Sequence, residues 1–558
     1  MVSHWCRKMS LNFKPLSIIN ISFFMLILAF LSACGGSSED DETPPPPPST
    51  SISSEKAARF LTQTTFGANS ESINELAGMG YDAWLVQQFN LPASLHRPLV
   101  LEYPDDDNLN QGHRYEVWWR TVLTSDDQLR QRVAYALSQI FVVSDKSTLV
   151  IVPYGVAGYY DILVRNAFGN YRDLLEEVTL SPIMGIYLSM LANQKPNLEF
   201  NIRPDENYAR EVMQLFSIGL VKLNLDGSIQ LDSNNQPIST YDQDVIKGFA
   251  HVFTGWNFAD NLSWYEPVFN FFSPMKAFED FHDTAEKQLL DGFTIEAGGT
   301  AQSDLDAALN NMFNHPNVGP FISFRLIQRL VTSNPTPAYI ERVASIFNNN
   351  GEGVRGDLKA VVTAILMDDE SLSESNLTND TFGKLKEPLL RFTQMWRAFD
   401  ASADSGKYWF DFSDYLTGQA PLSAPSVFNF YSPSFSPSGD IGDAALVAPE
   451  FQILNEIYIT HTLNWIAGST YVGYKGLTGD DYNEDRILID ISTELTLASD
   501  PVALVEHLNL LLLSGQMEGD LRSELISSIE AYPVSEEFIR VLNTLFLILS
   551  SPQFSIQR

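Results

Sequence analysis

The chain has 558 residues, of which 69 are acidic and 35 are lysine or arginine, so its formal charge at pH 7 is −34. Hydrophobic residues make up 44% of the chain, which is enough for a packed globular body and excludes wholesale disorder. Such an acidic chain repels phosphate backbones, which argues against general nucleic-acid binding. Two cysteines form neither a disulfide framework nor a cysteine-rich zinc site.

The first 33 residues have the pattern of an export signal. Three basic residues and no acidic ones precede an apolar run at 16–31, and this arrangement is typical of a signal peptide. The run ends in LSAC at 31–34, which resembles the lipobox of bacterial lipoproteins. The resemblance implies cleavage after residue 33 and a lipid anchor on Cys34. An uncleaved single-span anchor is the alternative.

Residues 34–53 form the predicted tether. They combine Gly and Ser with four acidic residues and five consecutive prolines, a composition that indicates an extended, solvated linker. Gly35 follows the lipid cysteine, where an Asp commonly retains lipoproteins in the inner membrane. We therefore expect the protein in the cell envelope, anchored to the outer membrane of a Gram-negative bacterium.

Apolar residues recur at helical spacing from residue 54 onwards. This periodicity indicates amphipathic helices at 55–64, 127–142, 206–220, 242–254, 338–347, 357–366, 385–399, 448–465, 501–513 and 537–549. One β-hairpin is predicted where 222–225 and 229–239 flank the turn pair Asp226-Gly227. The glycine pattern at 351–356 follows a helix and not a strand, so we interpret it as an interhelical loop and not a dinucleotide site.

No linker divides the chain after residue 54, and residues 400–437 have the composition of an aromatic-rich loop. The sequence therefore predicts one large, mainly α domain at 54–558, with a small β-hairpin insertion and long aromatic-rich loops. A separate C-terminal helical subdomain from about residue 440 is the alternative.

Several long motifs follow one another in a fixed order. They are NYAREVMQLFSIGL at 207–220, FAHVFTGW at 249–256, HD at 282–283, QAP at 419–421, APSVFNFY at 424–431 and SPQF at 551–554. From about residue 56 to the end, this succession resembles the bacterial family known as domain of unknown function 1800 (DUF1800). The resemblance implies an exported protein, often encoded beside a family whose fold resembles sulfatases, so an exported sulfatase-like protein is an expected partner. It implies no reaction.

Ionisable side chains in these motifs make up the candidate site. On a helix at 207–220, Glu211 belongs to a polar stripe beside Arg210, and on the next helix Asp244 and His251 lie opposite the apolar face. The resembled family often has Arg in place of His251. Adjacent His and Asp side chains can bind one metal, or the carboxylate can hold the imidazole tautomer.

We therefore expect an envelope-anchored hydrolase with a cleft of carboxylates and histidine, which suits proton transfer or hard-metal chemistry. The candidate acid, base or metal groups are Glu211, Asp244, His282 and Asp283, with a divalent metal on His282 and Asp283. The candidate substrate-binding residues are Arg210, Lys287 and Trp256. Structural roles for the same residues are the alternative, with Asp244 paired to Lys247 and Glu211 to Arg210.

A second hypothesis is a non-catalytic binding or assembly protein. An acidic body on a long tether can dock a partner protein or a glycan through aromatic loops. Trp264 and Tyr265 lie in such a loop, upstream of His282. Alanine substitutions of Glu211 and His282 distinguish the two hypotheses. The first hypothesis predicts that they abolish activity, and the second predicts that they mainly lower the stability of the fold.

Overall fold

The computed structural model describes residues 51–104, 109–410, 412–476 and 483–558. The chain divides into two units, Met1–Pro47 and Pro48–Arg558, and the described residues all belong to the second. The predicted signal peptide, Cys34 and the tether up to residue 50 lie outside them. Within the described ranges, no helix combines the length and apolar character that a membrane crossing requires.

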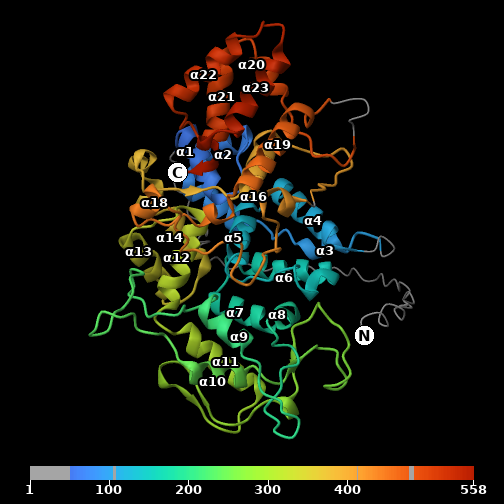
Figure 1. Cartoon of the computed structure of the whole chain (residues 1–558), viewed down its shortest axis with the longest axis vertical. Helices are drawn as coiled ribbons and strands as arrows, with labels where there is room; N and C mark the ends of the chain where they lie inside the picture. Colours follow the sequence, from blue (N-terminus) through green and yellow to red (C-terminus); the bar gives the residue numbers. More distant parts are fainter. Residues whose placement is uncertain (1–50, 105–108, 411, 477–482) are drawn as a thin grey trace, which may run out of the picture. The chain divides into compact units, whose positions relative to one another are not determined.

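The first part of the described unit is helical (Figure 1). The side chains of Ser53, Asn69 and Asn170 accept backbone N–H groups at helix starts, and such caps contribute about 1 kcal/mol each. The helices are α1 Ser54–Thr64, α2 Ser70–Asn90, α3 His96–Val100, α4 Gln111–Thr124, α5 Gln128–Ser138, α6 Pro153–Asn166, α7 Tyr171–Leu180 and α8 Pro182–Tyr187.

Short strands interrupt the helices in the middle part, and both two-stranded sheets there are antiparallel. Strand β1 pairs with β2, and β3 with β4. The elements are α9 Asn207–Gln214, α10 Gln243–Val252, β1 Trp256–Asn257, β2 Lys276–Ala277, β3 Lys287–Gln288, β4 Thr294–Ile295, α11 Ala301–Phe313, α12 Val318–Leu330, α13 Pro337–Asn348, α14 Leu358–Leu366 and α15 Asp369–Leu372.

The last part carries a third small sheet, in which β5 pairs with β6 near residue 558. Its α21 packs on α1 and α16, while the predicted subdomain boundary near residue 440 stays a prediction. The elements are β5 Lys384–Leu385, α16 Pro388–Ala398, α17 Ser413–Thr417, α18 Asp440–Asp443, α19 Glu456–Val472, α20 Ser492–Leu497, α21 Pro501–Leu513, α22 Gly519–Glu530, α23 Glu537–Leu549, α24 Pro552–Ser555 and β6 Ile556–Gln557.

The mainly helical fold class is confirmed, although several helices are shorter than predicted, such as α5, which ends at Ser138 and not at residue 142. Helix α9 ends at Gln214, with Leu215 as its C-cap, and not at residue 220; the chain then turns at 215–217 before Gly219, whose φ is +74°. The N–H groups of Phe216 and Gly219 donate to the carbonyls of Glu211 and Met213, five and six residues earlier, so the helical spacing of four is lost. Helix α19 begins at Glu456, after its cap Asn455, and not at residue 448.

The predicted hairpin is present as a three-segment meander without regular strands. Its isolated bridges join Val221 to Ser239, Leu223 to Ile229 and Leu231 to Pro237. The chain turns at Asp226-Gly227, as predicted, and a second time between residues 232 and 236. The segment 351–356 is a loop between α13 and α14, also as predicted.

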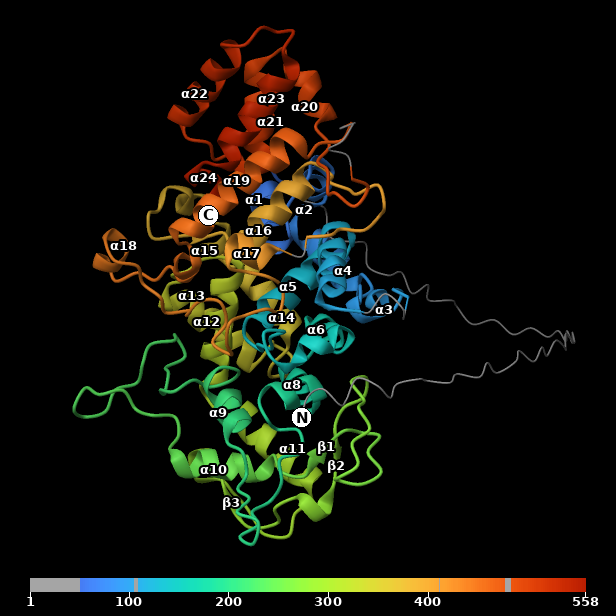
Figure 2. The ribbon, with the colours of Figure 1, turned by 45° about the vertical axis from the view of Figure 1, so that its right-hand side comes forward.

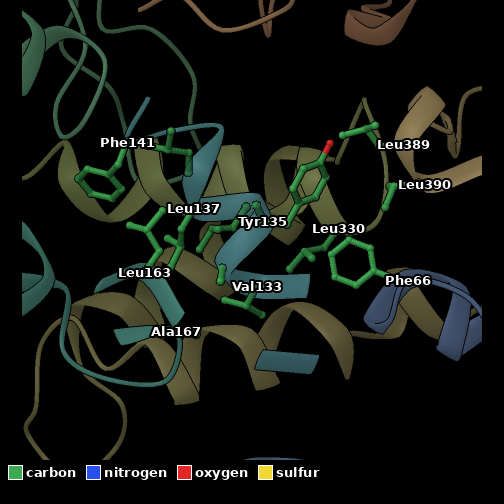
Figure 3. Close-up of a cluster of buried hydrophobic side chains, with 14 of the residues drawn as sticks. Phe66, Val133, Tyr135, Leu137, Phe141, Leu163, Ala167, Leu330, Leu389 and Leu390 are labelled. Atoms are coloured by element: carbon green, nitrogen blue, oxygen red, sulfur yellow. The ribbon is translucent and has the colours of Figure 1, made fainter. Parts of the chain in front are cut away.

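Helix α5 lies at the centre of the hydrophobic core. Every residue of α5 except Arg130 is buried, and the helix packs against α1, α2, α6 and α12. Figure 3 shows Val133, Tyr135 and Leu137 of α5 among the side chains that cover them, Phe66, Leu163, Ala167, Leu330, Leu389 and Leu390. Burial of these apolar side chains, at about 25 cal/mol per Å², is the main source of the fold's stability.

Helices α9, α10 and α11 are grouped together in Figures 1 and 2. Helix α10 contacts α9, α11 and β3. Gly248 of α10 allows the close approach of β3, because a Cβ atom there would lie 1.9 Å from the Gln288 carbonyl oxygen. This packing places the end of α10 beside the segment that carries His282 and Asp283.

Candidate functional site

The sequence-predicted residues on α9 and α10 separate into a surface group and a buried one. Arg210 is half-buried and pairs with Glu206 at 2.5 Å and with Gln243 at 2.9 Å, which ties α9 to α10. Asp244 is 73% exposed and pairs with Lys247 at 2.9 Å. Asp244 therefore has the Lys247 partner that the structural alternative expects, whereas Arg210 pairs with Glu206 and not with Glu211.

Glu211 lies in a buried environment of its own. The residue is 9% exposed, and its Oε2 has no hydrogen-bond partner among the described residues. Burial raises the pKa of Glu211, and the nearby Arg210 charge opposes this shift. Burial, together with the charge of Glu211, raises the pKa values of Tyr187 and Tyr241 to about 12.

His251 and Asp283 form a partly exposed pair. His251 lies in the last turn of α10, and its Nδ1 contacts Oδ2 of Asp283. Oδ1 of Asp283 accepts the Ala285 backbone N–H at 2.9 Å, and the Asp283 N–H donates to Thr254 Oγ1 at 2.9 Å. The hydrogen bond from His251 lowers the pKa of Asp283 to about 2, although partial burial opposes the shift. Nε2 of His251 has no hydrogen-bond partner within the described residues.

His282, next to Asp283, points into a sealed polar cluster. Its side chain is fully buried, with Nδ1 at 3.0 Å from the Thr254 carbonyl oxygen and Nε2 at 3.1 Å from Asp304 Oδ2. The same oxygen of Asp304 accepts Lys287 Nζ at 2.7 Å, and Lys287 is 2% exposed. Both ring nitrogens of His282 thus face oxygen atoms of the protein.

The structure therefore brings His282, Asp283 and Lys287 together and adds His251, Thr254 and Asp304. It leaves Arg210 and Asp244 in surface pairs, and Trp256 is 2% exposed in β1. No three His, Cys, Asp or Glu side chains of the described residues gather so that they could hold a metal ion. The metal role of His282 and Asp283 stays a prediction, and its residues are already hydrogen-bonded to protein groups.

Sequence reasoning missed a second cluster, here called the Glu387 cluster. Oε2 of Glu387 accepts Gln139 and Gln419 at 2.6 Å and the Tyr135 hydroxyl at 2.7 Å. Gln419 and the nearby Tyr431 belong to the motifs quoted above, and these two residues were the only part of the sequence analysis that pointed to the cluster. The remaining charged members are Arg132, Arg329, Lys384 and Glu450, all at most 4% exposed.

Charges of opposite sign lie close together in the Glu387 cluster. Lys384 Nζ lies 3.0 Å from Glu450 and 3.9 Å from Glu387. Burial alone would raise the pKa of Glu387, but Lys384, Arg329 and Arg132 outweigh it and lower the pKa overall. Such a network strongly penalises the loss of any single member.

The described fold is a mainly helical domain with small two-stranded sheets and two polar networks. A family profile described as "Protein of unknown function (DUF1800)" matches residues 59–556. The chain belongs to the DUF1800 family. No match was found among curated proteins or among solved structures.

Proposed function

We propose that the protein is an envelope-anchored hydrolase in which His251 is the general base and Asp283 orients it. The observation that carries the proposal is the contact between His251 Nδ1 and a carboxylate whose pKa is near 2, beside a ring nitrogen that has no partner among the described residues. A carboxylate on Nδ1 holds the imidazole tautomer and stabilises the imidazolium that forms when Nε2 takes a proton from water.

Exposure selects His251 in place of His282. The His251 side chain is 30% exposed, whereas His282 is fully buried with both nitrogens bonded. A general base must reach the proton that it removes. His282, Asp304 and Lys287 then support the loop that holds Asp283.

Hydrolysis of p-nitrophenyl acetate and p-nitrophenyl phosphate by the purified protein tests this proposal. We expect His251→Gln to lower kcat/KM about 10²–10⁴-fold, as for loss of a general base, and Asp283→Asn to have a smaller effect. His507→Gln is the matched control, because His507 also pairs with a carboxylate, Glu494, at 2.7 Å. Equal rates for His251→Gln and the wild type would contradict the proposal.

A non-catalytic docking function is the second candidate, and the loop between β1 and β2 favours it. Tyr265 is 76% exposed, Leu262 87% and Phe272 54%. Trp264 stacks on Phe281 with ring centroids 4.3 Å apart, which gives the loop a rigid aromatic base. Exposed rings on a firm support suit a sugar face or an apolar protein patch.

Substitution of the exposed loop residues tests the docking candidate. Tyr265→Ala combined with Phe272→Ala removes the exposed contact area and also the contacts of Phe272 with Tyr154 and Arg97, so thermal stability should fall only slightly. Binding to envelope glycans or to a co-expressed sulfatase-like protein is then lost. Binding that equals that of the wild type would rule this loop out as the docking surface.

We also propose that lipidation of Cys34 anchors the protein to the outer membrane. The support is the LSAC sequence at the end of the apolar run, followed by the proline-rich tether. Several acyl chains on one residue give stable membrane attachment. Labelled palmitate should enter the wild type but not Cys34→Ser, and the variant should leave the membrane fraction. A membrane-bound, unlabelled wild type would favour the single-span alternative.

A further inference from the structure

Arg391 of α16 is a buried cation without a partner among the described residues. It is 8% exposed, and its Nε is fully buried with no hydrogen-bond partner among the described residues. No ion pair or aromatic contact of its guanidinium is present in the described ranges either. The other buried arginines of these ranges have hydrogen-bond, ionic or aromatic partners, namely Arg59, Arg114, Arg132, Arg329 and Arg540.

Local charges make the region around Arg391 positive. Burial lowers the pKa of Arg391 to about 10, so the guanidinium stays charged at neutral pH. Lys386 lies close enough for the Arg391 charge to lower its pKa, and no carboxylate acts on either group in the described residues. An uncompensated buried charge is costly unless a counter-ion joins it.

Arg391 lines a cavity of about 280 Å³, here called the Arg391 cavity. This volume is close to the lower end of small-molecule sites, roughly 300 Å³. The wall also contains Ser550, whose hydroxyl oxygen is buried without a hydrogen-bond partner among the described residues. The rest of the wall is mainly apolar, with Leu385, Phe451, Leu454, Ile466, Leu549 and Ile556 among its residues.

We propose that the Arg391 cavity binds a fatty carboxylate, whose head group meets Arg391 and Ser550 and whose chain lies against the apolar wall. A guanidinium is the side chain best suited to a carboxylate, because its N–H groups match the two oxygens. The apolar wall excludes a small hydrophilic anion as the preferred ligand, since such an ion would leave the wall uncovered. Ile459 and Leu463, which are 38% and 36% exposed, form an apolar rim where a chain enters.

Calorimetric titration of the full chain with decanoate tests the proposal, and Arg391→Met is the decisive variant. We expect the wild type to bind one decanoate and Arg391→Met to bind it at least tenfold more weakly. Decanol, which lacks the charge, should bind both proteins equally weakly. Arg325→Met is the matched control, because Arg325 is a half-buried arginine that does not line the cavity.

Further measurements separate an effect on folding from an effect on binding, and distinguish a carboxylate ligand from a phosphate ligand. Arg391→Met should stay folded, since replacing an unpaired buried charge by an apolar residue is often neutral or stabilising. Should it unfold, Leu463→Trp at the rim blocks entry and must also weaken decanoate binding. Tighter binding of dodecyl phosphate than of decanoate would overturn the carboxylate assignment. Unchanged decanoate affinity in both variants, or no binding by the wild type, would overturn the site itself.

Discussion

At the scale of single residues, burial decides which ionisable groups behave unusually. Lys386 is 3% exposed, and its Nζ donates to the Gln394 amide oxygen at 2.7 Å and lies 4.7 Å from the Phe554 ring centre. These neighbours are uncharged, so they do not offset the loss of water. Burial, aided by Arg391, lowers the pKa of Lys386 to about 7.

Stability should therefore depend on pH through Lys386. Between pH 7 and about 10.5 the unfolded chain holds a proton on Lys386 that the folded chain lacks, so the free energy of unfolding rises with pH. The slope reaches at most about 1.4 kcal/mol per pH unit. Urea unfolding at pH 7.5 and 9.5 measures it, and Lys386→Met should lack this contribution. Identical pH slopes for the two proteins would contradict the prediction.

At the scale of elements, capping explains how α10 positions its residues. Oδ1 of Asp242 accepts the backbone N–H groups of Asp244 and Val245 at 3.0 and 3.1 Å. The cap sets where α10 begins, and His251 lies in its last turn. The position of the His251–Asp283 pair thus depends on a residue that is far from it along the helix.

Asp242→Ala should lower the free energy of unfolding by about 1 kcal/mol, the usual value for loss of an N-cap. Asp242→Asn keeps the acceptor and should lose much less. Chemical denaturation of the three proteins measures the difference. A wild-type stability for Asp242→Ala would mean that the cap does not determine the start of α10.

At the scale of the whole molecule, the Glu387 cluster joins segments far apart in the chain. Tyr135 and Glu387 are 252 positions apart, and Gln139 and Tyr431 are 292 apart. The cluster therefore connects α5, α12, β5 and the loops around Gln419 and Tyr431. Its charged side chains are buried away from water, so each one is stabilised mainly by the opposite charges and hydrogen bonds of the others.

Glu387→Gln should destabilise the whole fold by about 3–5 kcal/mol, because it leaves Lys384, Arg132 and Arg329 with less negative charge inside the protein. Tyr135→Phe removes one neutral donor and should cost about 1 kcal/mol. Thermal and urea unfolding of both variants measure the contrast. Equal effects of the two substitutions would show that charge balance does not hold the cluster together.

Local pattern predicted most of the elements. The helix at 501–513 matches α21 and that at 537–549 matches α23, because an apolar stripe every three to four residues is a property of neighbouring positions. The predicted helix ends were less accurate where tertiary contacts or turns compete with the helical hydrogen bonds, as at α9. The sequence singled out His282, Asp283 and Lys287, which lie close together, whereas Asp304 and the contact between His251 and Asp283 were not foreseen.

The sequence alone determined that this protein is mainly helical and which family it belongs to, and it predicts an export signal. Periodicity, motif order and N-terminal composition are all properties of neighbouring residues. Only the tertiary structure decided which charges meet. Asp304, Glu387 and Glu450 gain their partners through packing between distant segments, and the same packing buries Arg391 without a partner in the described part of the chain. Pairing and burial depend on where the chain returns in space, and no local pattern of residues specifies that.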